Sequence, residues 1–159
     1  MKNEKGITLI TLAITIAVMV ILSFTISVNI QPYLEQRTKK NFETDMQRLK
    51  EEIEQYYARV KELPLLNKYE DISMIQEVKN VNDNDEYYVI DIRQLELSLN
   101  YGKDYTTALK KGEATSITSE DNLKDLYIIN KQSHTIYYPK GVEYNNRIHY
   151  RLPEVFTKI

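Results

Sequence analysis

The sequence predicts an α+β protein in which a long N-terminal helix packs on a small antiparallel sheet. Three features support this fold class: an uncharged apolar stretch at 7–30, a helical stripe of apolar residues at 42–60, and short alternating segments near the C-terminus. We therefore divide the chain into four segments. They are a short polar leader (1–6), a membrane-spanning lower half of the helix (7–30), an amphipathic upper half (31–63) and a globular head (64–159).

Composition excludes several classes of protein. The 159 residues include 21 Lys+Arg and 23 Asp+Glu, so the net charge is too small for a strongly basic nucleic-acid binder. There is no cysteine, which excludes disulfides, thiolate zinc sites and thiol nucleophiles, and the four glycines are too scattered for a phosphate-binding loop. No catalytic triad, carboxylate pair or metal-ligand spacing is evident. We expect no catalytic residue, metal, cofactor or nucleic-acid partner.

The apolar stretch at 7–30 is long enough to cross a membrane. It holds 24 residues without a charge, and as a helix it spans ~36 Å against a hydrocarbon core of ~30 Å. Its Thr and Ser hydroxyls can bond the preceding helical turn, so lipid tolerates them. A buried core helix is the first alternative, but such helices rarely run this far without charge. A signal peptide is the second, but its apolar region is only ~7–15 residues long and Ser23 to Ser27 form a poor cleavage site.

Flanking charges do not decide the orientation of this helix. The N-terminal flank carries Lys2 and Lys5, and the C-terminal flank carries Arg37, Lys39 and Lys40. Because the positive-inside rule counts Lys and Arg on each side, these flanks leave both orientations open.

The junction between leader and helix reads Lys5-Gly6-Ile7-Thr8-Leu9-Ile10. A glycine here lacks a Cβ, so an extended leader can meet a helix with room for a peptidase to grip the junction. This junction resembles the class III leader of type IV prepilins and pseudopilins, in the form typical of low-GC Gram-positive bacteria. The resemblance implies that a prepilin peptidase cuts on the cytoplasmic side between Gly6 and Ile7, and that Ile7 is then N-methylated.

The resemblance further implies a structural role. The chain would be a minor pilin or pseudopilin of a type IV pilus, a competence system or a type II secretion-like filament, with its head outside the cytoplasm. Its partners would be the peptidase, sister subunits, an assembly platform and membrane lipid, and its filament-core helix would include Leu9, Thr11 and Leu12. Major subunits of the family carry Glu where Thr11 stands, which suggests a minor subunit. A membrane-anchored binding module that never polymerises is the alternative, and an enzyme is not expected.

The upper half of the helix carries one apolar stripe. After Pro32, which is expected to kink the helix, apolar residues recur at a spacing of four and three: Phe42, Met46, Leu49, Ile53, Tyr56 and Val60. We expect this stripe to pack on the protein's own sheet. A coiled-coil seam to another chain is the alternative, but two and a half heptads are short for one. Leu63-Pro64 is expected to end the helix.

The first part of the head is predicted as short elements between polar loops. Residues 70–80 favour a short helix, and 82–86 favour a solvated turn over a calcium loop, since the glycine and distal Glu of an EF-hand are missing. Residues 87–90 favour a strand. Asp91 is expected to cap a short helix bearing Ile92, Leu95 and Leu99, followed by a polar loop with short elements at 103–122.

The end of the chain is predicted as an antiparallel meander. Strands are expected at 125–130 and 134–138, followed by a hairpin of 142–144 and 147–151 around Asn145-Asn146. In its last strand, Ile148, Tyr150 and Leu152 are expected on the buried face, and Arg147, His149 and Arg151 on the wet face. We expect His134 to be exposed, most tyrosines to pack on the sheet, and Glu120, Asp121 and Asp125 to cap turns.

Overall fold

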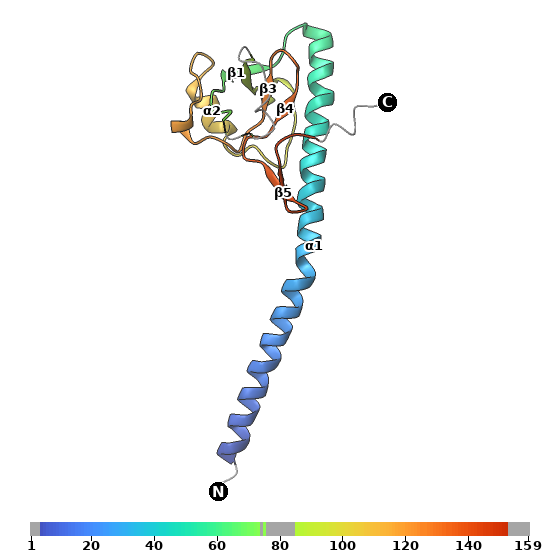
Figure 1. Ribbon diagram of the computed structural model, residues 1–159, viewed down its shortest axis with the longest axis vertical. Helices are drawn as coiled ribbons and strands as arrows, with labels where there is room; N and C mark the ends of the chain where they lie inside the picture. Colours follow the sequence, from blue (N-terminus) through green and yellow to red (C-terminus); the bar gives the residue numbers. More distant parts are fainter. Residues whose placement is uncertain (1–3, 74, 76–84, 153–159) are drawn as a thin grey trace. The chain divides into compact units, whose positions relative to one another are not determined.

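The computed structural model describes residues 4–73, 75 and 85–152, without the side chains of 4–8 and 26–29. Its first element is a helix of 57 residues, α1 (Glu4–Val60). The chain divides into two compact units, Met1–Arg37 and Thr38–Ile159, so that each unit contains part of α1 (Figure 1). The fold is α+β, as predicted.

The first unit is helical from Glu4 onward. The backbone at Gly6 is therefore part of α1, and the predicted extended leader is wrong at this point. The helix also continues through Pro32. As expected of hydroxyls in an apolar helix, Thr15 donates to the carbonyl of Leu12 (2.8 Å) and Thr25 to that of Ile21 (2.8 Å).

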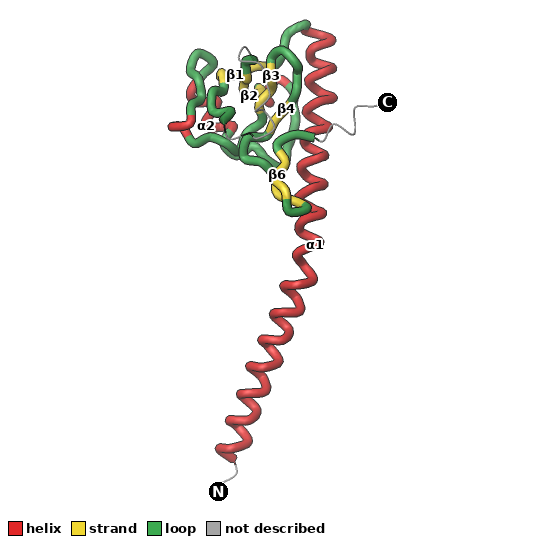
Figure 2. The backbone as a smooth tube through the Cα atoms, in the orientation of Figure 1, coloured by secondary structure: helices red, strands yellow, loops and turns green. Residues whose placement is uncertain are grey.

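The second unit contains a four-stranded antiparallel sheet in the order β1-β2-β3-β4 (Figure 2). Its strands are β1 (Leu65–Lys68), β2 (Tyr87–Ile90), β3 (Ile128–Asn130) and β4 (Ile136–Tyr137). The strand predicted at 87–90 is confirmed. The two predicted at 125–130 and 134–138 are also present, but each is shorter. Tyr88 pairs with Ile129 between β2 and β3, and Ile129 pairs with Ile136 between β3 and β4.

The two faces of this sheet bury separate apolar clusters. One face packs on α1 through Phe42, Met46, Leu49 and Ile53, each at most 3% exposed, which confirms the predicted stripe. Its last member is an exception, because Val60 is 41% exposed. The helix ends there, three residues before Leu63, and Lys61 has a positive φ of 65°.

The opposite face of the sheet packs on a short helix, α2 (Tyr105–Lys111), and on the loops beside it. Tyr87 and Val89 of β2 point into this second cluster, whereas Ile90 points into the first. This alternation follows from the two-residue period of a strand. The polar loop predicted at 103–122 has two short elements within the described residues, α2 and a 3-10 turn, η3 (Ser119–Asp121).

The segments before and after β2 differ from the prediction or lie outside the described residues. Asp91 caps a 3-10 turn, η2 (Ile92–Gln94), which is shorter than the predicted helix reaching Leu99. The predicted helix at 70–80 falls mostly on residues that are not described, and 70–73 are not helical. Of the predicted turn at 82–86, only 85 and 86 are described.

A separate hairpin, β5 (Val142–Tyr144) and β6 (Arg147–His149), packs against α1 in the second unit. Both residues of its predicted Asn145-Asn146 turn have positive φ, 52° and 57°, which suits a two-residue hairpin. The hairpin is confirmed.

The predicted faces of its second strand are wrong at Ile148 and His149, because Ile148 is 52% exposed whereas the His149 ring stacks on Tyr144 at 3.8 Å. Arg147 is exposed, and Tyr150 and Leu152 are partly buried against the core, as predicted. The pairing explains this error. Val142 and Tyr144 are buried, and their cross-strand partners His149 and Arg147 share that face, which leaves Ile148 outside with Glu143.

Candidate functional site

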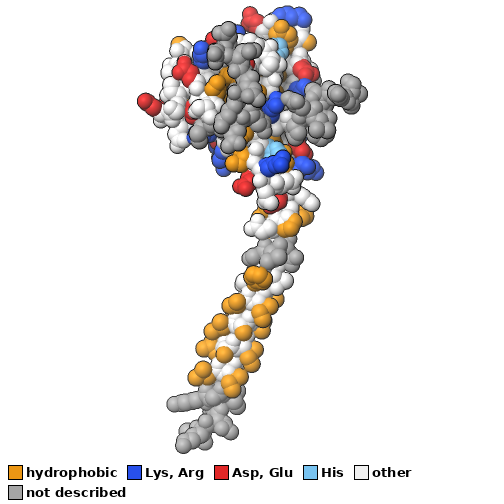
Figure 3. Space-filling view, in the orientation of Figure 1, with side chains coloured by type: hydrophobic (Ala, Val, Ile, Leu, Met, Phe, Trp, Pro, Cys, Tyr) orange, Lys and Arg blue, Asp and Glu red, His pale blue; other side chains and the backbone are white. Residues whose placement is uncertain are grey.

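The most prominent exposed feature of the first unit is the apolar surface of α1, by which we mean its described side chains from Leu9 to Leu34. Figure 3 shows apolar side chains along this part of the helix, and 9–34 contain no Lys, Arg, Asp or Glu. The large ones are 45–74% exposed: Leu9, Ile10, Leu12, Ile14, Ile16, Val18, Met19, Val20, Ile21, Leu22, Phe24, Ile30, Tyr33 and Leu34. Within the described residues, α1 is the one helix long and apolar enough to cross a membrane.

The residues predicted at the leader and in the helix core lie at the start of this surface. Gly6 and Ile7 are helical in backbone, and their side chains lie outside the described part. Leu9 and Leu12 are 70% and 58% exposed and lie three residues apart on one side of the helix. Thr11 is also exposed, and its carbonyl accepts a bond from the Thr15 hydroxyl (3.1 Å). Covering such a surface with lipid or with another apolar surface lowers the free energy of the system.

In the second unit, α1 carries a buried carboxylate that the sequence reading missed. Asp45 is 0% exposed beside the apolar stripe. Its oxygens accept bonds from the Asn100 amide N–H (2.7 Å), the Asn100 side chain (2.7 Å), the Tyr101 N–H (3.1 Å) and the Tyr127 hydroxyl (2.7 Å). Burial and the bond to Asp45 both raise the pKa of Tyr127. These bonds hold the loop after η2 against the helix. The spacing of residues in the sequence did not indicate this role of Asp45.

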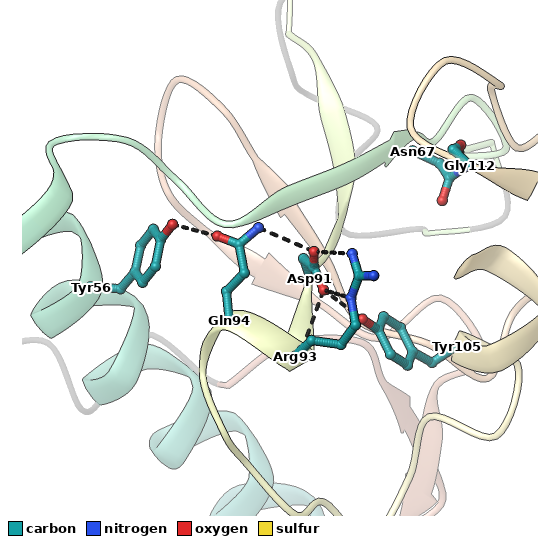
Figure 4. A network of polar contacts seen from close by, with 7 residues as sticks. All are labelled: Tyr56, Asn67, Asp91, Arg93, Gln94, Tyr105 and Gly112. Atoms are coloured by element: carbon teal, nitrogen blue, oxygen red, sulfur yellow. Dashed lines mark hydrogen bonds and ion pairs between the residues drawn. The ribbon is translucent and has the colours of Figure 1, made fainter. Parts of the chain in front are cut away.

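A second buried carboxylate, Asp91, joins three elements of the head (Figure 4). It accepts bonds from Arg93 Nη2 (2.6 Å) and Nε (2.8 Å), from the Tyr105 hydroxyl (2.6 Å) and from Gln94 (3.1 Å), while Tyr56 of α1 donates to Gln94. Burial acts to raise the pKa of Asp91, but these bonds outweigh it and lower that pKa to about 2. Burial and the bond to Asp91 raise the pKa of Tyr105 to about 12.

The remaining polar groups hold turns, as the sequence predicted for two of them. Asp125 accepts bonds from the Gly102 N–H (2.7 Å) and the Tyr138 hydroxyl (2.8 Å), and Asp121 accepts one from the Thr118 N–H (2.8 Å). Asn67, also in Figure 4, donates to the carbonyl of Gly112. The carboxylates of Asp121 and Asp125 are thus occupied by structural bonds. Among the described residues, no three His, Asp or Glu side chains are grouped so that they could hold a metal ion.

A shallow groove of about 380 Å³ lies between the end of α1 and the β3–β4 turn. Its floor includes Ile53 and Ile136, and one wall is formed by the Tyr57 and His134 rings, which meet edge to face at 5.1 Å. His134 is exposed, as predicted. Lys50 also lines the groove.

Comparisons with known proteins identify no relative. No family model, no curated protein and no solved structure matches this chain.

Proposed function

We propose that this chain is a pilin-like structural subunit, a minor pilin or pseudopilin, that is anchored in a membrane by α1. A prepilin peptidase removes residues 1–6, Ile7 is methylated, and the helix later packs with sister helices in a filament of the type IV pilus, competence or type II secretion-like kind. The head lies outside the cytoplasm. The role is structural, with no chemical step for the head to catalyse.

The observation that carries this proposal is the junction at Gly6-Ile7, directly before an apolar surface that the protein itself does not cover. Burying one Leu- or Ile-sized side chain is worth roughly 1.5–3 kcal/mol, so a helix with such residues all round is unstable in water. Lipid covers it in the anchored state, and sister helices cover it in a filament. A plain membrane anchor accounts for the apolar helix but needs no peptidase junction.

Mass spectrometry tests the processing step. Full-length protein expressed with a prepilin peptidase and extracted from membranes is expected to lose the first six residues and to gain one methyl group on Ile7. Gly6→Phe should block the cut, because a side chain then enters the extended grip of the peptidase. Ile10→Val, which preserves the apolar helix beyond the junction, is the matched control and should be processed normally. An uncut wild-type mass contradicts the proposal.

Thr11 supports the assignment as a minor subunit. In the family that the leader resembles, a Glu at this position meets the new N-terminal amine of a neighbour, and a buried carboxylate–ammonium pair is strong only when both charges are present. Thr11 supplies a hydroxyl alone. We expect Thr11→Glu to raise the incorporation of this chain into filaments, measured by immunoblotting of sheared fractions, with Thr15→Glu as the control. Wild-type chain as the main repeating subunit would contradict a minor role.

A second candidate function is favoured by the groove beside Tyr57 and His134. A membrane-anchored binding module would use such a groove without polymerising. Cysteine pairs on the apolar surface of α1 distinguish the two functions, since the natural chain has no cysteine. Crosslinked ladders that depend on the assembly machinery support the filament subunit, and their absence in processed protein supports the binding module.

A further inference from the structure

We propose that the groove between α1 and the β3–β4 turn binds an extended, acidic peptide segment of a partner protein. The segment would run along α1 and pair with the open edge of β4 at Ile136. All residues that line this groove belong to the unit Thr38–Ile159. The inference therefore concerns the head alone, goes beyond the filament role and does not depend on it.

The sheet has an open edge at one residue of β4, its outermost strand. At the end of β3, the Asn130 N–H donates to the Thr135 carbonyl (2.9 Å). Because bonded and non-bonded pairs alternate in an antiparallel ladder, the Ile136 N–H and C=O point away from β3. The Tyr138 N–H points the same way and donates to the Tyr150 carbonyl (2.7 Å). Within the described residues, Ile136 has no such partner on its outer side.

This pair of backbone groups suits an added strand. An extended peptide supplies a carbonyl for the Ile136 N–H and an N–H for the Ile136 carbonyl, which is how peptides add to the edges of sheets. Two bonds at a single residue give little affinity by themselves. The side chains of the groove must therefore supply most of the binding free energy.

The groove has the length of a short extended segment. Its lining on the α1 side runs from Lys50 to Lys61, a separation of ~16 Å along a helix. About five residues of an extended peptide cover the same distance. Between these two ends lie Ile53 and the Tyr57 ring, which is 40% exposed and offers an apolar contact for the peptide.

The opposite wall of the groove is held in place by the β3–β4 turn. The Asn130 side-chain oxygen accepts bonds from the Gln132 N–H (2.9 Å) and the Ser133 N–H (2.8 Å). The Asn130 carbonyl accepts one from the His134 N–H (2.9 Å). His134 has a positive φ of 57°, and its ring meets the Tyr57 ring at 5.1 Å. The turn thus keeps the His134 ring beside the helix, so the groove is formed before a peptide binds.

The charges of the groove favour an acidic segment. Lys50 and Lys61 are exposed, and neither forms an ion pair within the described residues. Among the described residues, Glu54 is the one acidic side chain in the lining. An Asp or Glu side chain near either end of the peptide would meet an unpaired ammonium group, whereas a basic peptide would be repelled.

Selection from a peptide library tests the docking. Phage that display random linear peptides are selected on the full chain in detergent, and synthetic fluorescent copies of the selected peptides are titrated by fluorescence anisotropy. We expect peptides in which Asp or Glu accompanies alternating β-branched residues. Lys50→Glu combined with Lys61→Glu should weaken their binding at least about tenfold, because both attractions become repulsions.

The matched control is Arg48→Glu combined with Lys110→Glu. It reverses the same number of exposed basic residues outside the groove and should bind the peptides like the wild type. Near-ultraviolet circular dichroism checks that each variant keeps the folded head. Failure to select any peptide overturns the proposal, and so does binding that Lys50→Glu with Lys61→Glu leaves unchanged in a folded protein. Selection of basic peptides overturns the charge preference.

Methylation of single peptide nitrogens tests the pairing with β4. One peptide N–H should bond the Ile136 carbonyl, so N-methylation at that residue should lower the affinity at least about tenfold. Methylation of either neighbour should have little effect, since their N–H groups point the other way. Equal tolerance of N-methylation along the whole peptide overturns the strand pairing. Peptide binding that falls as the chain self-associates at high concentration would place a second copy in the groove instead.

Discussion

The two halves of α1 have the same secondary structure but different surroundings. In the lower half, apolar side chains such as Leu12 and Phe24 are 58% and 72% exposed. In the upper half, Phe42 and Leu49 are fully buried against the sheet, and most positions outside the stripe are polar. The lower half therefore depends on an environment outside the chain, whereas the upper half is stabilised by the fold of the head.

This difference shows that one continuous helix can satisfy two physical requirements in turn. A stripe about a third of the circumference is enough when a sheet covers one side. Apolar residues all round are expected only when the whole circumference is to be covered, as in a bilayer or a helical bundle. The same substitution should consequently have different effects in the two halves.

The largest expected effect is that of a charge in the upper half. Leu49→Asp places an unpaired carboxylate in the core and should cost about 4 kcal/mol or more, enough to unfold a domain of ordinary stability. Leu12→Asp in the lower half is the matched control. It should leave the near-ultraviolet melting of the head unchanged while reducing membrane insertion, measured by vesicle flotation. Equal losses of head stability from both variants would show that the two halves are not independent.

A smaller loss is expected from Asp45, the polar contact that joins the upper half to the loop at 100–102. Asp45→Ala leaves the Tyr127 hydroxyl and several N–H donors in the interior without an acceptor. We expect the free energy of unfolding to fall by about 3 kcal/mol. Glu51→Ala, an exposed acidic residue on the same helix, should change stability little. Urea titration of the full chain in detergent measures both. If the two variants have the same midpoint, the bonds to Asp45 do not stabilise the head.

Acid should weaken the head through Asp91. Its pKa is about 2 in the folded protein against an ordinary 3.8, so it contributes stability above pH 3.8 that is lost as the pH falls toward 2. Because its partner Arg93 is 52% exposed, we expect at most about 2 kcal/mol, reduced further by salt. Comparing urea midpoints at pH 5 and pH 2 tests this. Asp91→Asn should lose less on acidification than the wild type, and the exposed control Glu120→Gln should behave like the wild type.

The smallest effect is expected at the end of the stripe. Val60 continues the spacing of the buried residues but is 41% exposed, so Val60→Asp should change the unfolding free energy by less than about 0.5 kcal/mol. Ile53→Asp, two turns earlier and 3% exposed, is the comparison that should abolish folding. Strong destabilisation by Val60→Asp would mean that the buried seam extends to the last residue of α1.

Short elements show where sequence reasoning lost accuracy. The strand at Tyr87–Ile90 was predicted at its observed bounds because β-branched and aromatic residues mark it directly. The helix α2 was expected only as an unspecified short element of the polar loop at 103–122. Its type and bounds were not predicted, since only Ala108 of its seven residues is buried and its periodicity is correspondingly weak. The carboxylates Asp45 and Asp91 became recognisable as buried hubs only from their partners, up to 82 positions away in the chain.

By itself, the sequence determined the apolar helix, the amphipathic stripe, the Asn145-Asn146 hairpin and the α+β class. Each of these depends on local periodicity or turn chemistry, which residues close together in the sequence determine without contacts from the rest of the chain. The tertiary structure decided which face of the last hairpin is buried, so that Ile148 is outside and the His149 ring stacks on Tyr144. The two faces of this alternating strand have similar composition, so its own sequence does not determine which face is buried. The buried face is the one that it shares with the buried residues of its partner strand.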